Sequence, residues 1–264
     1  MPQTILQTIA DHARVRVAAQ KELCPPAQMR ARALAMPRDN AFPFEAALAG
    51  PDVGFICECK KASPSKGLIA PDFPYLEIAQ AYAAAGAAGI SVLTEPKWFL
   101  GRDEYLQQIA AAVKTPCLRK DFTVDDYMID HAKVLGAAAV LLICALMDTA
   151  TLAHRLQYCF DLGLTALVEA HDEAEVAMAV AAGARVIGVN NRNLHDFTVD
   201  VHNSLRLRAL APPHIKFVAE SGIRTAADVA LLRQNGVNGV LVGETLMRAP
   251  DKAAALRMLR GETA

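Results

Sequence analysis

The sequence predicts an α/β fold in which eight parallel strands close into a (β/α)8 barrel, preceded by a helical N-terminal extension. Strand-like apolar segments recur eight times along the 264 residues, and amphipathic or Ala-rich helical segments separate them. Most strands are almost continuously apolar, as in Ala138–Cys144, which favours a parallel sheet covered by helices. An open doubly wound sheet is the weaker alternative, because no G-x-G-x-x-G follows the first strand.

The first 50 residues do not follow the repeat. They predict a helix from about Thr4 to Lys21, then a Pro-containing connection and further helical or irregular structure. We therefore expect one domain over residues 1–264, with an extension at 1–50 and the barrel at 51–264.

The predicted strands follow one another at intervals of roughly 20 to 35 residues, which suits the βα units of a TIM barrel. They are Val53–Lys60, Gly89–Thr94, Pro116–Phe122, Ala138–Cys144, Ala166–Ala170, Val186–Asn191, Phe217–Glu220 and Gly239–Val242. Helical patterns lie between them, for example Leu76–Ala85, Asp125–Leu135, Thr149–Phe160 and Glu173–Ala182. Glycines suited to helix C-termini follow such patterns at Gly86, Gly136, Gly163, Gly183 and Gly236.

Composition and charge favour a small molecule as the binding partner. Hydrophobic residues make up 53% of the chain, the formal net charge is -1, and no run of like charge suggests a nucleic-acid or membrane surface. Residues 1–14 lack the pattern of a leader peptide, and no later segment has the apolar length of a membrane span, so we expect a cytoplasmic protein. We interpret the six cysteines as reduced core residues, because none form a C-x-x-C pair.

Several predicted strands end in a charged or amide side chain. Active sites of such barrels form at the C-terminal ends of the strands, so these residues are expected to share one site. Glu58 and Lys60 lie two apart on the first strand and therefore face the same way. The other candidates at strand ends are Lys120, Glu169, Asn190 and Arg192.

Structural interpretations compete with several of these assignments. Glu58 and Lys60 could form only an ion pair within the barrel. Arg119 and Asp121 alternate with Lys120, so we expect them to stabilise the barrel rim instead. His171 follows Glu169 by two residues, a spacing that could suit a metal, but no further His or Cys cluster joins it, so we predict no metal site.

The last two strands end in small residues, as expected of a phosphate site. Ser221-Gly222 and Gly243-Glu244 place glycine where backbone amides can approach an anion, and barrels commonly bind phosphate there. Thr225 and Asp228 resemble a helix-capping pair just beyond. The alternative is that Gly222 and Gly243 only turn the chain.

Six motifs, in order, resemble those of indole-3-glycerol phosphate synthase, an enzyme family of tryptophan biosynthesis. They are Glu58-Cys59-Lys60-Lys61-Ala62-Ser63-Pro64-Ser65-Lys66-Gly67, Val92-Leu93-Thr94-Glu95, Leu118-Arg119-Lys120-Asp121-Phe122, Leu167-Val168-Glu169, Asn190-Asn191-Arg192-Asn193-Leu194 and Glu220-Ser221-Gly222-Ile223. The resemblance extends from the N-terminal extension, which caps the barrel mouth in that family, through the eighth strand.

The resemblance implies a reaction without cofactor or metal. The substrate would be 1-(o-carboxyphenylamino)-1-deoxyribulose 5-phosphate, and the products indole-3-glycerol phosphate, carbon dioxide and water. Lys120 would be the general acid at the ketone, Glu169 the acid/base partner in dehydration, and Lys60 a second acid held by Glu58. Asn190 and Arg192 would hold substrate hydroxyls and the carboxylate-bearing end, or organise the charged network.

Ser63 and Ser221 would also line the site, with Gly222, Gly243 and Glu244 at the phosphate end. Phe99 and Phe122 are placed to form an apolar wall for the aromatic ring. Trp98 could belong to that wall or to ordinary packing, and it replaces the smaller aromatic residue usual in the family. Because the chain ends about twenty residues after Glu244, we expect a monofunctional protein rather than a fusion with a second barrel.

Two other functions fit part of the pattern. A Schiff-base aldolase on the same barrel could use Lys60 or Lys120 as an amine nucleophile. A non-catalytic sensor of a phosphorylated metabolite would keep the anion site, but it would have little need for two lysines and two glutamates at one barrel mouth. The sequence does not indicate the oligomeric state.

Overall fold

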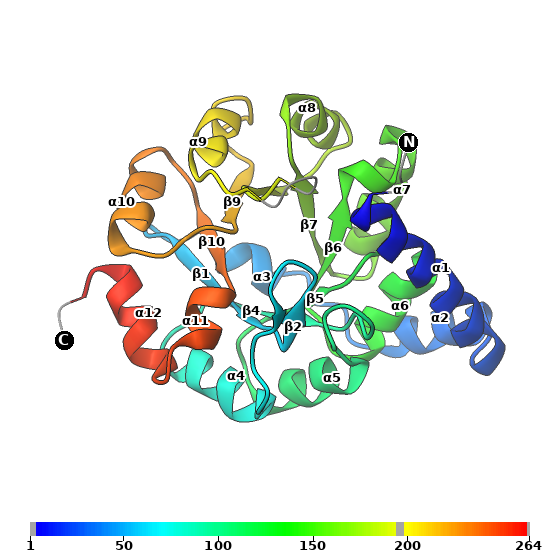
Figure 1. Ribbon diagram of the computed structural model, residues 1–264. Coiled ribbons are helices and arrows are strands. Elements are labelled where there is room, and N and C mark those ends of the chain that lie inside the picture. Colours follow the sequence, from blue (N-terminus) through cyan, green and yellow to red (C-terminus); the bar gives the residue numbers. More distant parts are fainter. Residues whose placement is uncertain (1–3, 194–197, 263–264) are drawn as a thin grey trace.

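The computed structural model describes residues 4–193 and 198–262, which form the predicted barrel (Figure 1). Its parallel strands are hydrogen-bonded in the order β1-β10-β9-β8-β7-β6-β5-β4, and β4 pairs with β1 to close the barrel. The strands are β1 Gly54–Cys59, β4 Gly89–Leu93, β5 Cys117–Lys120, β6 Ala139–Ile143, β7 Thr165–Ala170, β8 Val186–Asn190, β9 Lys216–Glu220 and β10 Gly239–Val242. Each overlaps its predicted segment, so the predicted fold class is confirmed.

Helices surround the barrel and cover the outer face of the strands (Figure 1). They are α4 Tyr75–Ala84, α5 Asp103–Ala112, α6 Asp126–Val134, η1 Cys144–Leu146, α7 Thr149–Asp161, α8 Glu173–Ala181, α9 His202–Arg208, α10 Ala226–Gln234, α11 Glu244–Arg248 and α12 Lys252–Arg260. The predicted capping pair is confirmed, because Thr225 and Asp228 form a reciprocal capping box at the start of α10. The five predicted stop glycines all adopt positive φ.

Alternation along each strand divides the core into two layers. On β1, Cys57 and Cys59 belong to the apolar layer between strands and helices, whereas Ile56 belongs to the layer inside the barrel. Glu58 follows Ile56 by two residues and so also faces the interior. The pleat thus directs single charged residues at strand ends into the barrel mouth.

The N-terminal extension consists of α1 Ile5–Leu23, α2 Pro26–Ala35 and α3 Pro43–Ala46. Ile9 and Ala13 of α1 pack with the apolar layer inside the barrel. Phe44 of α3 approaches the opposite end, where an added Cβ on Gly89 would lie only 2.8 Å from its ring. The extension therefore covers parts of both ends of the barrel rather than forming a separate body.

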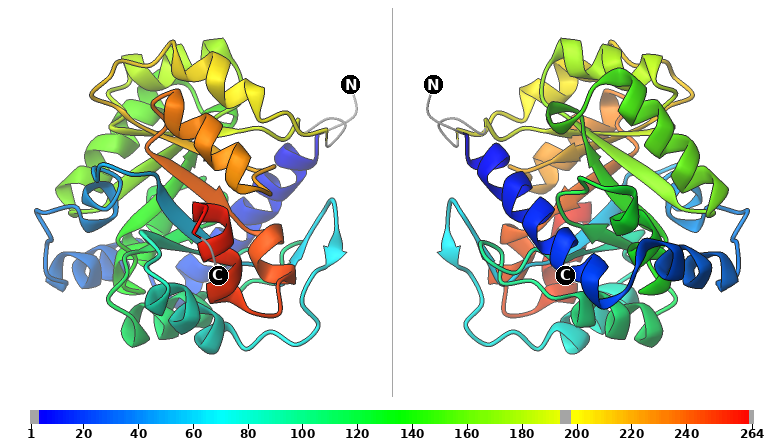
Figure 2. Two further views of the ribbon diagram at one scale, coloured as in Figure 1. Left: turned by 90° about the vertical axis from the view of Figure 1, so that its left-hand side faces the viewer. Right: turned by 90° about the vertical axis from the view of Figure 1, so that its right-hand side faces the viewer.

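A short hairpin that the sequence analysis did not predict follows β1. Its strands, β2 Ala62–Ser63 and β3 Gly67–Leu68, pair with each other. Figure 2 shows this hairpin and the start of α1 at the same end of the barrel. Two-residue strands carry no readable periodicity, which is why the sequence pattern did not reveal them.

Among the described residues, none of the helices combines the length and the apolar character that crossing a bilayer requires. All six cysteines are unpaired; Cys24 is half-buried and the others are buried.

Candidate active site

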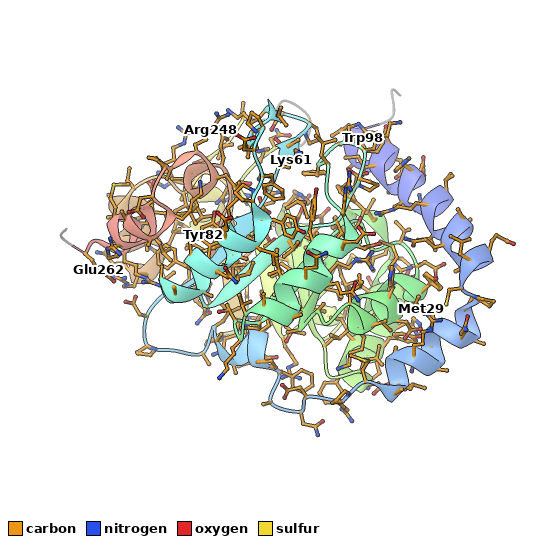
Figure 3. The ribbon with its side chains drawn as sticks, turned by 90° about the horizontal axis from the view of Figure 1, so that it is seen from below. Met29, Lys61, Tyr82, Trp98, Arg248 and Glu262 are labelled. Carbon is orange, nitrogen blue, oxygen red and sulfur yellow. The ribbon has the colours of Figure 1, made fainter. Side chains whose placement is uncertain are left out.

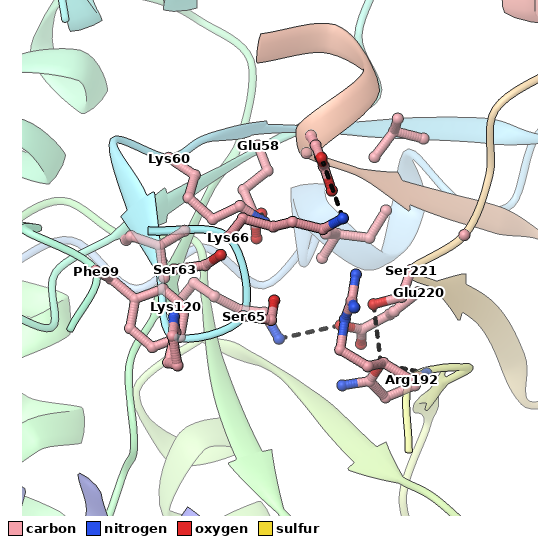
Figure 4. A pocket seen from close by; sticks show the side chains of 18 of the residues that line it. Glu58, Lys60, Ser63, Ser65, Lys66, Phe99, Lys120, Arg192, Glu220 and Ser221 are labelled. Carbon is pink, nitrogen blue, oxygen red and sulfur yellow. Dashed lines mark hydrogen bonds and ion pairs between the residues drawn. The ribbon is translucent and has the colours of Figure 1, made fainter. Parts of the chain in front are cut away.

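One cavity of about 490 Å³ opens at the C-terminal ends of the strands. Every residue that the sequence predicts for the site lines it. They are Glu58, Lys60, Ser63, Phe99, Lys120, Phe122, Glu169, Asn190, Arg192, Ser221, Gly222, Gly243 and Glu244. Figure 4 shows side chains from the hairpin segment and from several strand ends converging there.

Glu58 and Lys60 form a pair in the cavity wall, and Lys60 donates a hydrogen bond from Nζ to Glu58 Oε1. Their side chains are 4% and 18% exposed, so the pair is held largely out of water. Gly243 lies directly against it: an added Cβ would be 2.3 Å from Glu58 Oε1 and 2.8 Å from Lys60 Nζ. A side chain at this position would therefore displace the pair.

Lys120 extends from the end of β5 between two carboxylates on the far side of the barrel. Its Nζ lies 2.8 Å from Glu169 Oε2 and 3.0 Å from Glu220 Oε2. Burial alone would lower the pKa of Lys120, but Glu169, Glu220 and Glu58 outweigh burial and raise it above its ordinary value. Lys120 is therefore held as an ammonium ion.

The two carboxylates around Lys120 have opposite pKa shifts. Burial would raise the pKa of Glu169, but Lys120 and His171 outweigh it and hold that pKa well below its ordinary value. Burial and the neighbouring charge of Glu169 raise the pKa of Glu220 to about 7 despite the attraction of Lys120. The site thus contains one firmly ionised carboxylate beside one that can carry a proton near neutral pH.

Glu220 is a site residue that the sequence reasoning missed as a candidate. It is 2% exposed, lines the cavity and hydrogen-bonds Lys120. Its position at the end of a predicted strand, directly before Ser221 and Gly222, was the available signal.

Asn190, at the end of β8, joins the charged groups to the neighbouring loop. Its Nδ2 donates to Glu169 Oε1 at 3.3 Å, and its Oδ1 accepts from Ser221 Oγ at 2.9 Å and from the backbone N–H of Arg192 at 3.0 Å. Ser221 adopts a left-handed backbone with φ 68°, a strained conformation for a residue with a side chain. Leu194, the last residue of this predicted motif, lies outside the described residues.

The predicted phosphate end contains cations that the sequence reasoning did not select. Lys66, Arg224 and Arg248 line the cavity beside Glu244. Glu244 Oε1 lies 3.7 Å from Lys66 Nζ and 3.1 Å from Arg248 Nε. Figure 4 shows Lys66 reaching from the hairpin segment across this end of the cavity.

The aromatic wall consists of Phe99 and Phe122, whose ring centroids are 6.1 Å apart. Trp98 lies outside the cavity wall and contacts His12 of α1 edge to face at 5.2 Å (Figure 3). Glu95, which is fully buried, accepts hydrogen bonds from the backbone N–H groups of three following residues and so fixes this segment. Of the two interpretations for Trp98, the geometry favours packing.

Two further predicted placements are confirmed. Arg119 does not line the cavity, whereas Asp121 lies at its edge and pairs with Arg16 of α1 at 2.7 Å. Arg119 pairs with Asp103 of α5 at 2.7 Å, so both stabilise the rim. Over the described parts of the chain, no group of three or more His, Cys, Asp and Glu side chains is arranged to hold a metal ion.

Comparison with known proteins gives consistent matches along the chain. The family model described as indole-3-glycerol phosphate synthase matches residues 6–259. Curated proteins of that name are similar in Ruminiclostridium cellulolyticum, with 52% identity over 97% of this chain and 99% of the relative, and in Endomicrobium trichonymphae, with 49% identity over 97% and 99%. The one from Roseiflexus castenholzii is 47% identical over 98% of each chain.

Solved structures with much lower identity share the fold. A 3-hexulose-6-phosphate synthase has a TM-score of 0.65 at 18% identity and covers 80% of this chain and 100% of its own. KGPDC from Streptococcus mutans has a TM-score of 0.60 at 12% identity, with 79% and 96% covered. At such identities the likeness supports the barrel architecture alone.

Proposed function

We propose a division of chemical roles in this cavity from the premise that the chain belongs to the indole-3-glycerol phosphate synthase family. The enzymes of this family are carboxy-lyases of tryptophan biosynthesis. The reaction closes the pyrrole ring of 1-(o-carboxyphenylamino)-1-deoxyribulose 5-phosphate and releases carbon dioxide and water, giving indole-3-glycerol phosphate.

Ring closure needs a proton donor at the ketone oxygen. The substrate ring carbon that bears the carboxylate attacks the ketone carbon, and the oxygen gains negative charge as the new bond forms. Lys120 is the general acid in this proposal, because its ammonium is buried in the cavity wall between Glu169 and Glu220. Loss of carbon dioxide then restores the aromatic ring.

Dehydration needs an acid for the departing hydroxyl and a base for the proton that is removed. Glu169 suits the base, because it is held ionised, and Lys60, held by Glu58, suits the second acid. Asn190 and Arg192 would hold substrate hydroxyls and the carboxylate-bearing end, and Ser63 and Ser221 would line the site.

The ends of the substrate would lie at opposite parts of the cavity wall. Phe99 and Phe122 form an apolar surface suited to the aromatic ring. The backbones of Gly222, Gly243 and Glu244 would receive the phosphate, which supports a small phosphorylated substrate as the partner. The reaction as proposed uses no cofactor.

The position of Lys120 is the observation that carries this proposal over the Schiff-base alternative. A Schiff base requires a neutral amine, whereas the carboxylates around Lys120 favour its ammonium form. Incubating the purified chain with the substrate and following indole fluorescence tests the function directly. Absence of turnover in every buffer, or a covalent adduct trapped by borohydride, would contradict the proposal.

We further propose that residues 1–264 form one domain, since Ile9 of α1 packs inside the barrel and Arg16 of α1 pairs with Asp121 at its rim. The unpaired, mostly buried cysteines support a cytoplasmic location.

A further inference from the structure

The imidazole of His171 lies between two carboxylates just beyond the end of β7. Nε2 is 3.2 Å from Glu169 Oε1, and Nδ1 is 2.9 Å from Glu175 Oε2 on α8. The same oxygen of Glu175 accepts a hydrogen bond from the backbone N–H of His171 at 2.8 Å. Nδ1 is thus hydrogen-bonded to Glu175, whereas Nε2 faces Glu169 at ion-pair distance without hydrogen-bond geometry. His171 is not part of the cavity wall that contains Lys120.

We propose that His171 is a positioning residue for Glu169: Glu175 fixes the imidazole ring, and the ring in turn holds Oε1 of Glu169 in the cavity wall. This inference rests on the proposed function, because it assumes that Glu169 takes part in the reaction. It extends the working site by two side chains, one of which lies on the outer helix α8.

The two carboxylate oxygens of Glu169 have different hydrogen-bond donors. Oε2 accepts from Lys120 at 2.8 Å, and Oε1 accepts from Asn190 Nδ2 at the longer distance of 3.3 Å. Without His171, Oε1 would keep only that amide. The imidazole therefore supplies the charged contact on the side of the carboxylate that Lys120 does not reach.

The two flanking carboxylates favour a doubly protonated ring. The imidazolium turns positive charge and an N–H group towards each of them, whereas neutral imidazole has a single N–H. Burial would lower the pKa of His171, but Glu169 and Glu175 outweigh it and raise the pKa to about 10.

The imidazolium also adds positive charge beside Glu169. Lys120 is shared between Glu169 and Glu220, so Glu169 does not have that cation to itself. His171 supplies a second positive charge near Glu169, which lowers the energy of keeping this buried carboxylate ionised.

Other charged groups near His171 are Asp172, Arg192 and Asp200, which line the adjoining cavity with it and with Asn203. Thr4 and Gln7 at the start of the N-terminal extension also line this cavity and carry no charge. Asn203 Nδ2 donates to the backbone oxygen of His171 at 3.2 Å, and Asp172 caps α8 by accepting from the N–H of Glu175. Glu169 and Glu175 are the carboxylates that contact the ring nitrogens.

The test compares His171→Gln and Glu175→Gln with the control Glu173→Gln, which changes a 65% exposed glutamate on the same helix. We expect His171→Gln to lower kcat on the order of tenfold, as outer partners of working groups do, with KM nearly unchanged. In a plot of kcat against pH, the acidic limb of His171→Gln should move to higher pH, because Glu169 is protonated more easily without the imidazolium. Glu175→Gln should shift the limb in the same direction by less, and the control should behave as wild type.

A measurement independent of activity tests the proposed role of His171 if a variant fails to fold. The ¹⁵N spectrum of the wild-type protein at pH 8 should show both ring nitrogens of His171 protonated, and Glu175→Gln should lower its titration midpoint. A neutral His171 ring at pH 8, or a folded His171→Gln enzyme with a wild-type pH profile, would overturn the inference. Wild-type turnover in Glu169→Gln would instead overturn the proposed role of Glu169.

Discussion

Lys120 and Glu169 lie 49 positions apart in the chain, yet Lys120 Nζ is 2.8 Å from Glu169 Oε2. The contact joins the ends of β5 and β7, which are separated in the barrel by β6. Glu220 completes the arrangement from the end of β9. A proton donor is thus held among groups from three strands before substrate binds, which is the preorganisation that general acid catalysis needs.

Lys120→Ala should lower turnover by about two to three orders of magnitude, the usual contribution of general acid catalysis. The fold should persist, but Tm at pH 8 should fall, because Glu169 and Glu220 lose their shared cation. Part of that loss should disappear at lower pH as Glu220 takes up a proton. Fluorescence assays and thermal melts check this, with exposed Lys114→Ala as the control; near wild-type turnover would remove Lys120 from the mechanism.

Glu169→Gln should bind substrate nearly as before but fail in dehydration. The amide keeps the shape and hydrogen bonding of the side chain but cannot accept the proton. Single-turnover mass spectrometry should therefore detect a decarboxylated intermediate that still carries its hydroxyl group. If the variant binds poorly yet reacts normally once saturated, Glu169 is a binding group and the proton leaves by another route.

Lys66→Met should raise KM about tenfold and leave kcat nearly unchanged, since one charge-assisted contact to phosphate at a part-exposed site contributes about 1.5 kcal/mol. Replacing Gly222 or Gly243 would be a poorer test of the phosphate site, because the added side chain would also displace neighbouring groups. A Cβ at Gly243 would strike Glu58, and one at Gly222 would lie 2.5 Å from Val199.

Lys61→Met is the matched control for Lys66, because Lys61 lies in the same segment but does not line the cavity. The difference in affinity between Lys66→Met and Lys61→Met should vanish when a dephosphorylated substrate analogue is used. An equal loss of affinity for phosphorylated and dephosphorylated ligands in Lys66→Met would place the phosphate elsewhere.

Phe99→Ala should raise KM about tenfold, because stacking and edge contacts between aromatic groups add about 0.5–1.5 kcal/mol to the loss of apolar area. Trp98→Phe should change KM by less than about twofold, because Trp98 packs on His12 outside the cavity. Steady-state assays of both variants decide this point. The reverse ranking would place Trp98 in the wall that binds the aromatic ring.

His131 should make the fold sensitive to acid. Burial and the positive charge of Arg119 lower the pKa of His131 to about 4 against the attraction of Asp103. Between pH 6.5 and 4 the unfolded chain therefore binds a proton that the folded chain does not, so stability falls as pH decreases through this range.

His131→Asn should lose less stability than wild type between pH 6.5 and 4. The difference in Tm should be a few degrees, since about 1 kcal/mol corresponds to about 2–4 °C in a domain of this size. Thermal melts across the range measure it, with exposed His202→Gln as the control. Parallel curves for wild type and His131→Asn would show that His131 does not cause the acid sensitivity.

Local pattern was enough to predict the architecture and many of the residues that line the cavity, although not Glu220. Eight apolar segments with helical patterns between them indicated the barrel. The periodicity of strands and helices can be recognised from residues that are close together in the sequence. The rule that barrel sites form at strand ends then brought Glu58, Lys120 and Glu169 to one cavity. The hairpin formed by Ala62–Ser63 and Gly67–Leu68 could not be predicted, since its strands are too short to show a period.

The pairings and charge states were decided only by the tertiary structure. The sequence alone placed Lys120 near several carboxylates but could not show that Glu169 and Glu220 share it, or that their pKa values move in opposite directions. Those shifts depend on burial and on distances of a few ångströms between residues far apart in the chain. The sequence by itself determined which side chains reach the barrel mouth; closure of the barrel fixed which of them touch, because only there do the strand ends meet.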